Sequence, residues 1–159
     1  MKAVAGRDVV SILLELATDI SYWNKKYTTK TILVEKLDEL GLTAHQIEVL
    51  GFIYANPELD TVSQLAAELF ISKGSLSLML SKLQQSGFVH KRSAKGEDDG
   101  RKVYVSLTEK GTAAVEEMRD AMLGSAGVAF DNMEEEKRVL FYTKLEELKE
   151  LFRAGGWKE

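Results

Sequence analysis

The sequence predicts a mostly helical α+β protein with one short pair of strands near its centre. Apolar residues recur at steps of three and four along most of the chain, which is the helical period. Residues 102–107 instead alternate between apolar and polar side chains, and residues 88–92 read as the partner strand. The 159 residues include one proline and no long glycine- or serine-rich tract, so one domain with helical extensions accounts for the length.

Two helices are expected before residue 42. The first covers residues 8–27, because five apolar side chains repeat at helical steps and share one face. A bend follows at residues 27–31, and a second helix over residues 32–40 ends at Gly41. The apolar face of the first helix consists of Val9, Leu13, Leu16, Ile20 and Trp23.

Three central helices carry signals for their first turn. Thr43 with Gln46, and Thr61 with Gln64, have the spacing of a capping box, in which each side chain bonds to the backbone amide of the other residue. Ser72 is placed to cap the third helix. The predicted helices cover residues 43–56, 61–69 and 73–86, with a turn at residues 70–71 and a stop at Gly87.

After the two strands and the polar loop between them, a helix is expected from residue 108 to about Met122, with Gly124 and Gly127 weakening its end. A last helix over residues 134–153 is expected to be capped by Asp131 or Asn132. The central order is helix, turn, helix, strand, loop, strand. That order predicts a winged helix-turn-helix.

The charge distribution singles out the same central region. The chain has a net charge of −4 and a balanced composition, but residues 61–110 hold eight basic and five acidic side chains. The absence of cysteine excludes disulfides, cysteine-based zinc sites and thiol redox sensing. No apolar run is long enough to span a membrane, and Asp8 and Glu15 come too early for a signal peptide. We expect a cytoplasmic protein.

Enzymatic activity is not expected. None of the common nucleophile, phosphate-loop, zinc-protease or dinucleotide motifs occurs. Acidic runs occur at residues 134–136 and 146–147 with helical spacing, and residues 134–136 stand at a helix start, where the helix dipole favours acids. With two histidines, His45 and His90, a multi-histidine zinc site cannot be built from one chain, so neither a metal nor a cofactor is expected.

The second helix of the helix-turn-helix is a candidate for recognition of double-stranded DNA. If Leu76, Met79, Leu80 and Leu83 face inward, the outward positions carry hydroxyls, two lysines and one leucine, and the first amides can bind phosphate. Leu78 could contact a thymine methyl or pack on a neighbouring loop. A winged helix can also serve as a protein-interaction module, so both functions stay open. The outward residues are Lys73, Ser75, Ser77, Leu78, Ser81 and Lys82.

Three segments then carry a resemblance to a known family: residues 42–50, residues 61–92 (TVSQLAAELFISKGSLSLMLSKLQQSGFVHKR) and residues 98–111 (DDGRKVYVSLTEKG). Together they resemble the MarR (multiple antibiotic resistance regulator) family of winged-helix transcription factors. The resemblance implies a homodimer that binds a palindromic operator, as a repressor modulated by a small ligand. The implied divisions are dimerisation helices at 1–41, a DNA-binding domain at 42–111 and further dimerisation helices at 112–159.

The resemblance also implies which residues contact DNA. Arg101 matches the wing arginine that enters the minor groove, and Asp99 matches the acid that holds it. Leu78 departs from the family, where a polar residue is more common, and Glu97 and Asp98 make the wing unusually acidic. The implied DNA-contact residues are Thr61, Ser63, Lys73, Ser75, Ser77, Leu78, Lys82, Lys95, Asp99, Arg101 and Lys102.

The family resemblance further implies a small effector, often phenolic or anionic, bound in a cleft between the dimer helices and the DNA-binding lobe. Cysteine-based oxidant sensing, which some members use, is excluded by the composition. The candidate ligand residues are Tyr22, Trp23, His45 and Tyr54, although core packing is the more usual role of each aromatic side chain.

Overall fold

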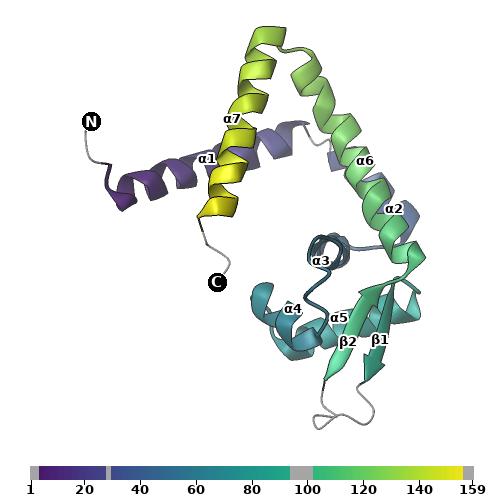
Figure 1. The fold of residues 1–159 in the computed structure, drawn as a ribbon. Coiled ribbons are helices and arrows are strands. Elements are labelled where there is room, and N and C mark those ends of the chain that lie inside the picture. Colours follow the sequence, from purple (N-terminus) through teal and green to yellow (C-terminus); the bar gives the residue numbers. More distant parts are fainter. Residues whose placement is uncertain (1–3, 28–29, 94–101, 156–159) are drawn as a thin grey trace. The chain divides into compact units, whose positions relative to one another are not determined.

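A computed structural model describes residues 4–27, 30–93 and 102–155 (Figure 1). By its internal contacts the chain divides into two compact units. The winged unit comprises residues 30–122, and the helical unit comprises the described parts of residues 1–29 and 123–159. The elements are α1 (Gly6–Tyr27), α2 (Lys30–Leu40), α3 (Ala44–Ala55), α4 (Val62–Glu68), α5 (Lys73–Gln85), β1 (Val89–Ser93), β2 (Val103–Leu107), α6 (Glu109–Asp131) and α7 (Glu135–Ala154).

The winged unit has a closed hydrophobic core. Helices α3, α4 and α5, both strands and the start of α6 contribute to it. Leu50, Leu65, Leu76, Leu80 and Leu83 have no exposed surface at all. In Figure 1, α4 and α5 lie beside the hairpin of β1 and β2, with α3 next to them. The predicted mostly helical, winged helix-turn-helix fold is confirmed.

The predicted helix starts are present as hydrogen bonds. The Gln46 amide donates to Thr43 Oγ1 (3.3 Å), and the Thr43 amide donates to Gln46 Oε1 (2.8 Å). Thr61 and Gln64 form the same reciprocal pair at the start of α4. These contacts satisfy amides that the first helical turn leaves without backbone partners, so the local sequence alone fixes where α3 and α4 begin.

The two strands form an antiparallel hairpin. Val89 pairs with Leu107 and Lys91 pairs with Val105, and Thr61 forms an isolated bridge to Tyr104 on the other side of β2. Because neighbouring residues of a strand point to opposite faces, Val89 and Val105 are buried while His90 is exposed. The wing is thereby attached to the core through one face.

The joint between β2 and α6 is set by Thr108 and Gly111. The Thr108 hydroxyl donates to the carbonyl of Gly87 (2.7 Å) and accepts from the amide of Gly111 (2.9 Å). The Thr108 amide donates to the carbonyl of Phe88 (3.0 Å). A Cβ atom on Gly111 would overlap that same Phe88 oxygen. Glycine is therefore required at this position by close backbone approach.

A second contact within the winged unit joins α2 to α6. The Lys36 ammonium lies 2.7 Å from Glu117 Oε2 and 3.1 Å from Glu39 Oε2. The hydrogen bond to Glu117, followed by that to Glu39, raises the pKa of Lys36 above its ordinary value. This surface pair links α2 to α6, and it contributes little to stability because it is solvated.

Two predictions for the C-terminal helices are wrong. Helix α6 continues through Gly124 and Gly127 to Asp131 instead of ending near Met122. Neither Asp131 nor Asn132 caps the last helix: α7 has Glu134 at its N-cap position, without a side-chain cap. Asp131 still belongs to α6, and the Asn132 side-chain amide donates back to the Val128 carbonyl (2.9 Å).

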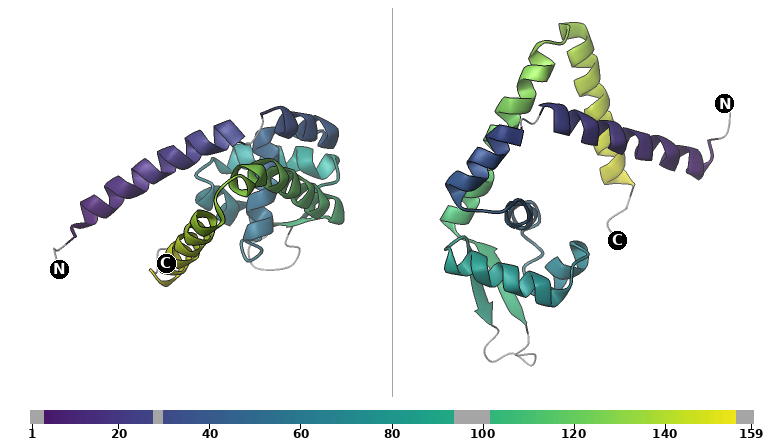
Figure 2. Two further views of the ribbon diagram at one scale, coloured as in Figure 1. Left: turned by 90° about the horizontal axis from the view of Figure 1, so that it is seen from above. Right: turned by 180° about the vertical axis from the view of Figure 1, so that it is seen from behind.

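The helical unit has little core. No residue of α7, all of which the structure describes, is buried. A row of aromatic rings joins its helices: Trp23 lies 5.3 Å from Phe130, and Phe130 lies 5.4 Å from Phe141, centroid to centroid. Beyond this cluster, α1 and α7 run in different directions, as the view from above shows (Figure 2). Large parts of their apolar faces therefore lack a partner within the unit.

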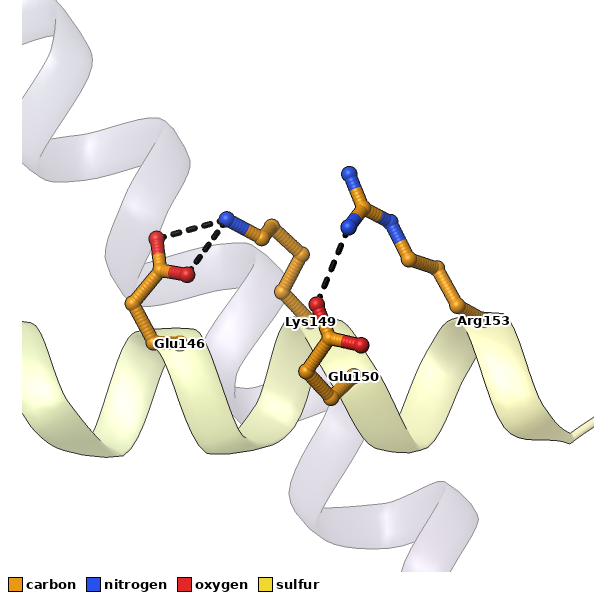
Figure 3. Close-up of polar contacts among 4 residues, drawn as sticks. All are labelled: Glu146, Lys149, Glu150 and Arg153. Atoms are coloured by element: carbon orange, nitrogen blue, oxygen red, sulfur yellow. Dashed lines mark hydrogen bonds and ion pairs between the residues drawn. The ribbon is translucent and has the colours of Figure 1, made fainter.

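The polar face of α7 carries several ion pairs, each between residues three positions apart. Lys149 contacts both carboxylate oxygens of Glu146 at 2.6 Å, and Arg153 contacts Glu150 at 2.9 Å (Figure 3). Lys144 binds Glu147 in the same way. These acids have lysine or arginine partners on a solvated face of the helix.

Candidate nucleic-acid interface

The orientation of α5 is fixed from its buried side. Leu76, Leu80 and Leu83 point into the core, so the opposite surface of the helix must face out. At 100° per residue, Ser75, Leu78 and Lys82 fall within about 60° of one another on that surface. All three are exposed. We call these three residues the outer stripe of α5.

The first turn of α5 has features that favour anion binding. Ser72 caps it: the Ser75 amide donates to Ser72 Oγ (3.1 Å), and the Ser72 hydroxyl donates to Ser75 Oγ (2.8 Å). Lys73 is exposed beside them. The positive end of the helix dipole, the remaining first-turn amides and the ammonium group together favour phosphate.

Ser77 and Ser81 lie toward the wing rather than on the outer stripe. Both are half-buried. The Ser81 hydroxyl donates to the Ser77 carbonyl (2.8 Å) and accepts a hydrogen bond from Lys91 Nζ (2.9 Å). Lys91 in β1 therefore ties the hairpin to α5, a contact that the sequence analysis missed. The signal was present, because Lys91 is two residues from buried Val89 and shares its face of the strand.

The other predicted contact residues are placed as follows. Thr61 is half-buried with its hydroxyl engaged in capping α4, whereas Ser63 in the first turn of α4 is exposed. Lys102 is exposed directly before β2. Arg92, which was not among the predicted contacts, lies 5.2 Å over the Tyr104 ring on the outer face of the wing. Lys95, Asp99 and Arg101 lie outside the described residues, so the pairing of Asp99 with Arg101 stays a prediction.

The predicted ligand residues fall in both units. Tyr22 is 70% exposed and Trp23 packs against Phe130 with tilted rings, both in the helical unit. His45 and Tyr54 lie at opposite ends of α3, about 13 Å apart along its axis. The Tyr54 hydroxyl donates to Glu116 Oε1 (3.2 Å). The Tyr54 ring lines a pocket of about 210 Å³ together with Pro57, Leu59 and Leu107. A pocket shared by all four residues stays a prediction.

Other site chemistries find no support in the described part of the chain. Within residues 4–27, 30–93 and 102–155, no three acidic or histidine side chains gather closely enough to hold a metal ion. None of the described helices combines the length and apolar character that crossing a bilayer requires.

Comparison with known proteins agrees with this geometry. A family model described as the MarR family matches residues 40–102. The organic hydroperoxide resistance transcriptional regulator of Bacillus subtilis is 31% identical over 115 residues, which cover 70% of this chain and 76% of that protein. The chain belongs to the MarR family. It is a transcriptional regulator of that family, and the expectation that it is not an enzyme is confirmed because its relatives are regulators.

Solved structures give the same fold. Wild-type MarR from E. coli in its apo form is 26% identical with a TM-score of 0.61, over 84% of this chain and 96% of that one. The MepR–DNA complex from S. aureus is 20% identical with a TM-score of 0.62, over 83% of this chain and 98% of that one. Both solved structures therefore have a fold similar to that of this chain.

Proposed function

We propose that this MarR-family regulator binds double-stranded DNA in a sequence-specific manner through α5 and the wing. The observation that carries the proposal is the outward surface of α5, where Lys73, Ser75 and Lys82 are exposed above a fully buried row of leucines. The width of the major groove admits such a helix, and its N-terminal residues reach base edges. The similar fold of MepR, which was solved in complex with DNA, supports the same mode of binding.

The proposed active form is a homodimer on a palindromic operator. Support comes from the exposed apolar residues of the helical unit, for example Ile12 at 65% and Leu151 at 69%. A second copy of the chain would bury these faces, and two-fold symmetry would then place two copies of α5 on matching half-sites. The half-sites should lie 10–10.5 bp, or a multiple of that, apart.

The proposed regulation is repression relieved by a small phenolic or anionic effector. A ligand that favours one spacing of the two recognition helices by about 1–3 kcal/mol changes DNA affinity about 5–150-fold. The Bacillus subtilis relative is named for organic hydroperoxide resistance, but this sequence has no cysteine. This chain therefore cannot sense oxidants by thiol oxidation, and we propose reversible ligand binding as the mechanism.

The test is selection of bound duplexes from a random DNA library, with a Lys73→Ala/Lys82→Ala variant and Arg101→Ala in parallel. Glu39→Ala, a surface change on α2, is the matched control. We expect the unmodified protein to select a palindromic motif. The Lys73→Ala/Lys82→Ala and Arg101→Ala variants should bind this motif less tightly. Loss of the Arg101 side chain should weaken DNA binding by about 1–3 kcal/mol. If the unmodified protein enriches no sequence at low salt, the proposal is wrong.

A second function, binding of a protein partner without DNA, is favoured by one observation. Leu78, in the middle of the outer stripe, is 63% exposed, and an apolar side chain there suits a protein surface. Salt dependence separates the two functions. A DNA complex with several phosphate contacts loses orders of magnitude in affinity as salt rises, whereas an apolar protein contact does not.

A further inference from the structure

The turn between α4 and α5 contains a residue in an unfavourable conformation. Phe70 has φ +53°, and among the described non-glycine residues it alone has a positive φ. Its amide donates to the Ala67 carbonyl (3.2 Å), and the Ile71 amide donates to the Ala66 carbonyl (3.1 Å). These bonds close the end of α4, so the left-handed conformation at Phe70 is built into the turn.

Phenylalanine is a poor choice there on two grounds. A side chain with a Cβ atom is strained in the left-handed region, which glycine enters without strain. The ring is also 94% exposed, so packing against the protein offsets almost none of that strain. The turn needs the positive φ but not the aromatic side chain, and a strained residue whose side chain the fold does not use is characteristic of functional positions.

The surroundings of Phe70 indicate what the ring contacts. It lies two residues before Ser72, the cap of the proposed recognition helix, and Leu78 is exposed on that helix. Residues 69–82 contain Lys73 and Lys82 but no acidic residue. Two copies of such a surface would repel each other, and the charge suits a polyanion. DNA also offers apolar surface in the thymine methyl groups and the deoxyribose rings.

We propose that Phe70 is a DNA-contact residue, whose ring, together with Leu78, covers apolar surface of the bound duplex. The contacted surface is either a thymine methyl group or a deoxyribose. This inference rests on the proposed DNA-binding function and adds to it a specific residue outside the recognition helix. It also accounts for Leu78, where the sequence departs from the polar residue typical of the family.

The test compares affinities for the duplex recovered by selection. Phe70→Gly and Phe70→Asn both suit a positive φ and remove the ring, so each should weaken binding about tenfold. Phe70→Tyr keeps the ring and should stay within about twofold, the usual range for a surface substitution. Val34→Ala, which removes a 46% exposed apolar side chain from α2, is the control and should leave the affinity unchanged.

Stability gives a second readout. Phe70→Gly relieves the backbone strain, so its urea midpoint should equal or exceed that of the unmodified protein. A variant that folds at least as well but binds DNA less tightly identifies a contact residue. If Phe70→Gly and Phe70→Asn bind the duplex as tightly as the unmodified protein, the proposal is overturned and the exposed ring is left to a protein partner.

Replacement of thymine by uracil at each position of the duplex separates the two DNA surfaces, because uracil lacks only the methyl group. If the ring contacts a methyl group, uracil at one position weakens binding of the duplex by the unmodified protein. The same uracil does not further weaken binding by the Phe70→Gly variant. For a deoxyribose contact, uracil changes nothing while Phe70→Gly still weakens binding. Failure of the unmodified protein to bind any duplex would instead refute the proposed function itself.

Discussion

The two units bury their apolar residues to very different degrees. In the winged unit, five leucines of α3, α4 and α5 are completely buried. In the helical unit, α7 has no buried residue, and the side chains of Phe141, Leu145 and Phe152 are 45–48% exposed. The apolar residues of the winged unit are therefore buried within that unit, whereas the helical unit leaves apolar surface exposed, as interaction sites do.

The sharpest way to test this contrast is to truncate one leucine in each unit. Leu80→Ala should cost about 2–5 kcal/mol of unfolding free energy, because it leaves a cavity in a core that cannot collapse fully. Leu151→Ala, at a side chain that is 69% exposed, should change the stability of a dissociated chain by less than about 0.5 kcal/mol. Urea unfolding at low protein concentration measures both. Equal losses would contradict the contrast between the units.

The helical unit should respond instead through association. Leu145→Glu places a carboxylate on the exposed apolar face of α7 and should weaken the proposed dimer about a hundredfold, since burial of an unpaired charge is costly. Thr143→Glu, two residues away and about 160° around the same helix, is the control. Sedimentation equilibrium over a range of concentrations gives the dissociation constants. A Leu145→Glu protein that dimerises normally would exclude this face from the interface.

Two glycines of α6 should respond with opposite signs. Gly111→Ala should destabilise the winged unit by about 1–3 kcal/mol, because the new Cβ meets the Phe88 carbonyl oxygen and the backbone must shift. Gly124→Ala meets nothing within 4 Å and should stabilise the helix by about 0.5–1 kcal/mol. Thermal unfolding of the two variants measures the sign of each change in stability. Destabilisation by Gly124→Ala would show that this surface of α6 is covered.

The smallest effect is expected on the polar face of α7. Lys149→Ala removes the contacts with Glu146 shown in Figure 3, yet an exposed pair contributes about 0–1 kcal/mol. The midpoint of unfolding should barely move, and the difference should shrink further in high salt. A large, salt-insensitive loss would indicate that this face is buried in the assembled protein.

The elements that sequence predicted well are those with local causes. The capping boxes at Thr43 and Thr61 join residues three positions apart, so the sequence contains the whole interaction. The end of α6 was mispredicted because the two glycines weaken a helix but do not end it when neighbouring helices hold it in place. In this structure Phe130, beyond both glycines, packs against Trp23 and Phe141, and a single-chain pattern does not reveal such tertiary contacts.

The candidate interface was predicted in the same uneven way. The periodicity of Leu76, Leu80 and Leu83 correctly gave the outward surface of α5. Ser81 was expected to face outward but is half-buried against Lys91, since the hairpin covers that side of the helix. Phe70 was read as a turn residue, and its positive φ came only from the structure. The signal available in the sequence was an aromatic residue directly after the end of a helix, where glycine is common.

The joint formed by Thr108 and Gly111 changes what part of the family signature means. Residues 107–111 belong to one of the segments that resemble the family, and in this structure they join the end of the wing to the start of α6. Thr108 and Gly111 stabilise this joint whether or not the protein contacts DNA. This part of the resemblance therefore reflects the fold, whereas the residues that would distinguish one DNA site from another lie on the exposed surface of α5.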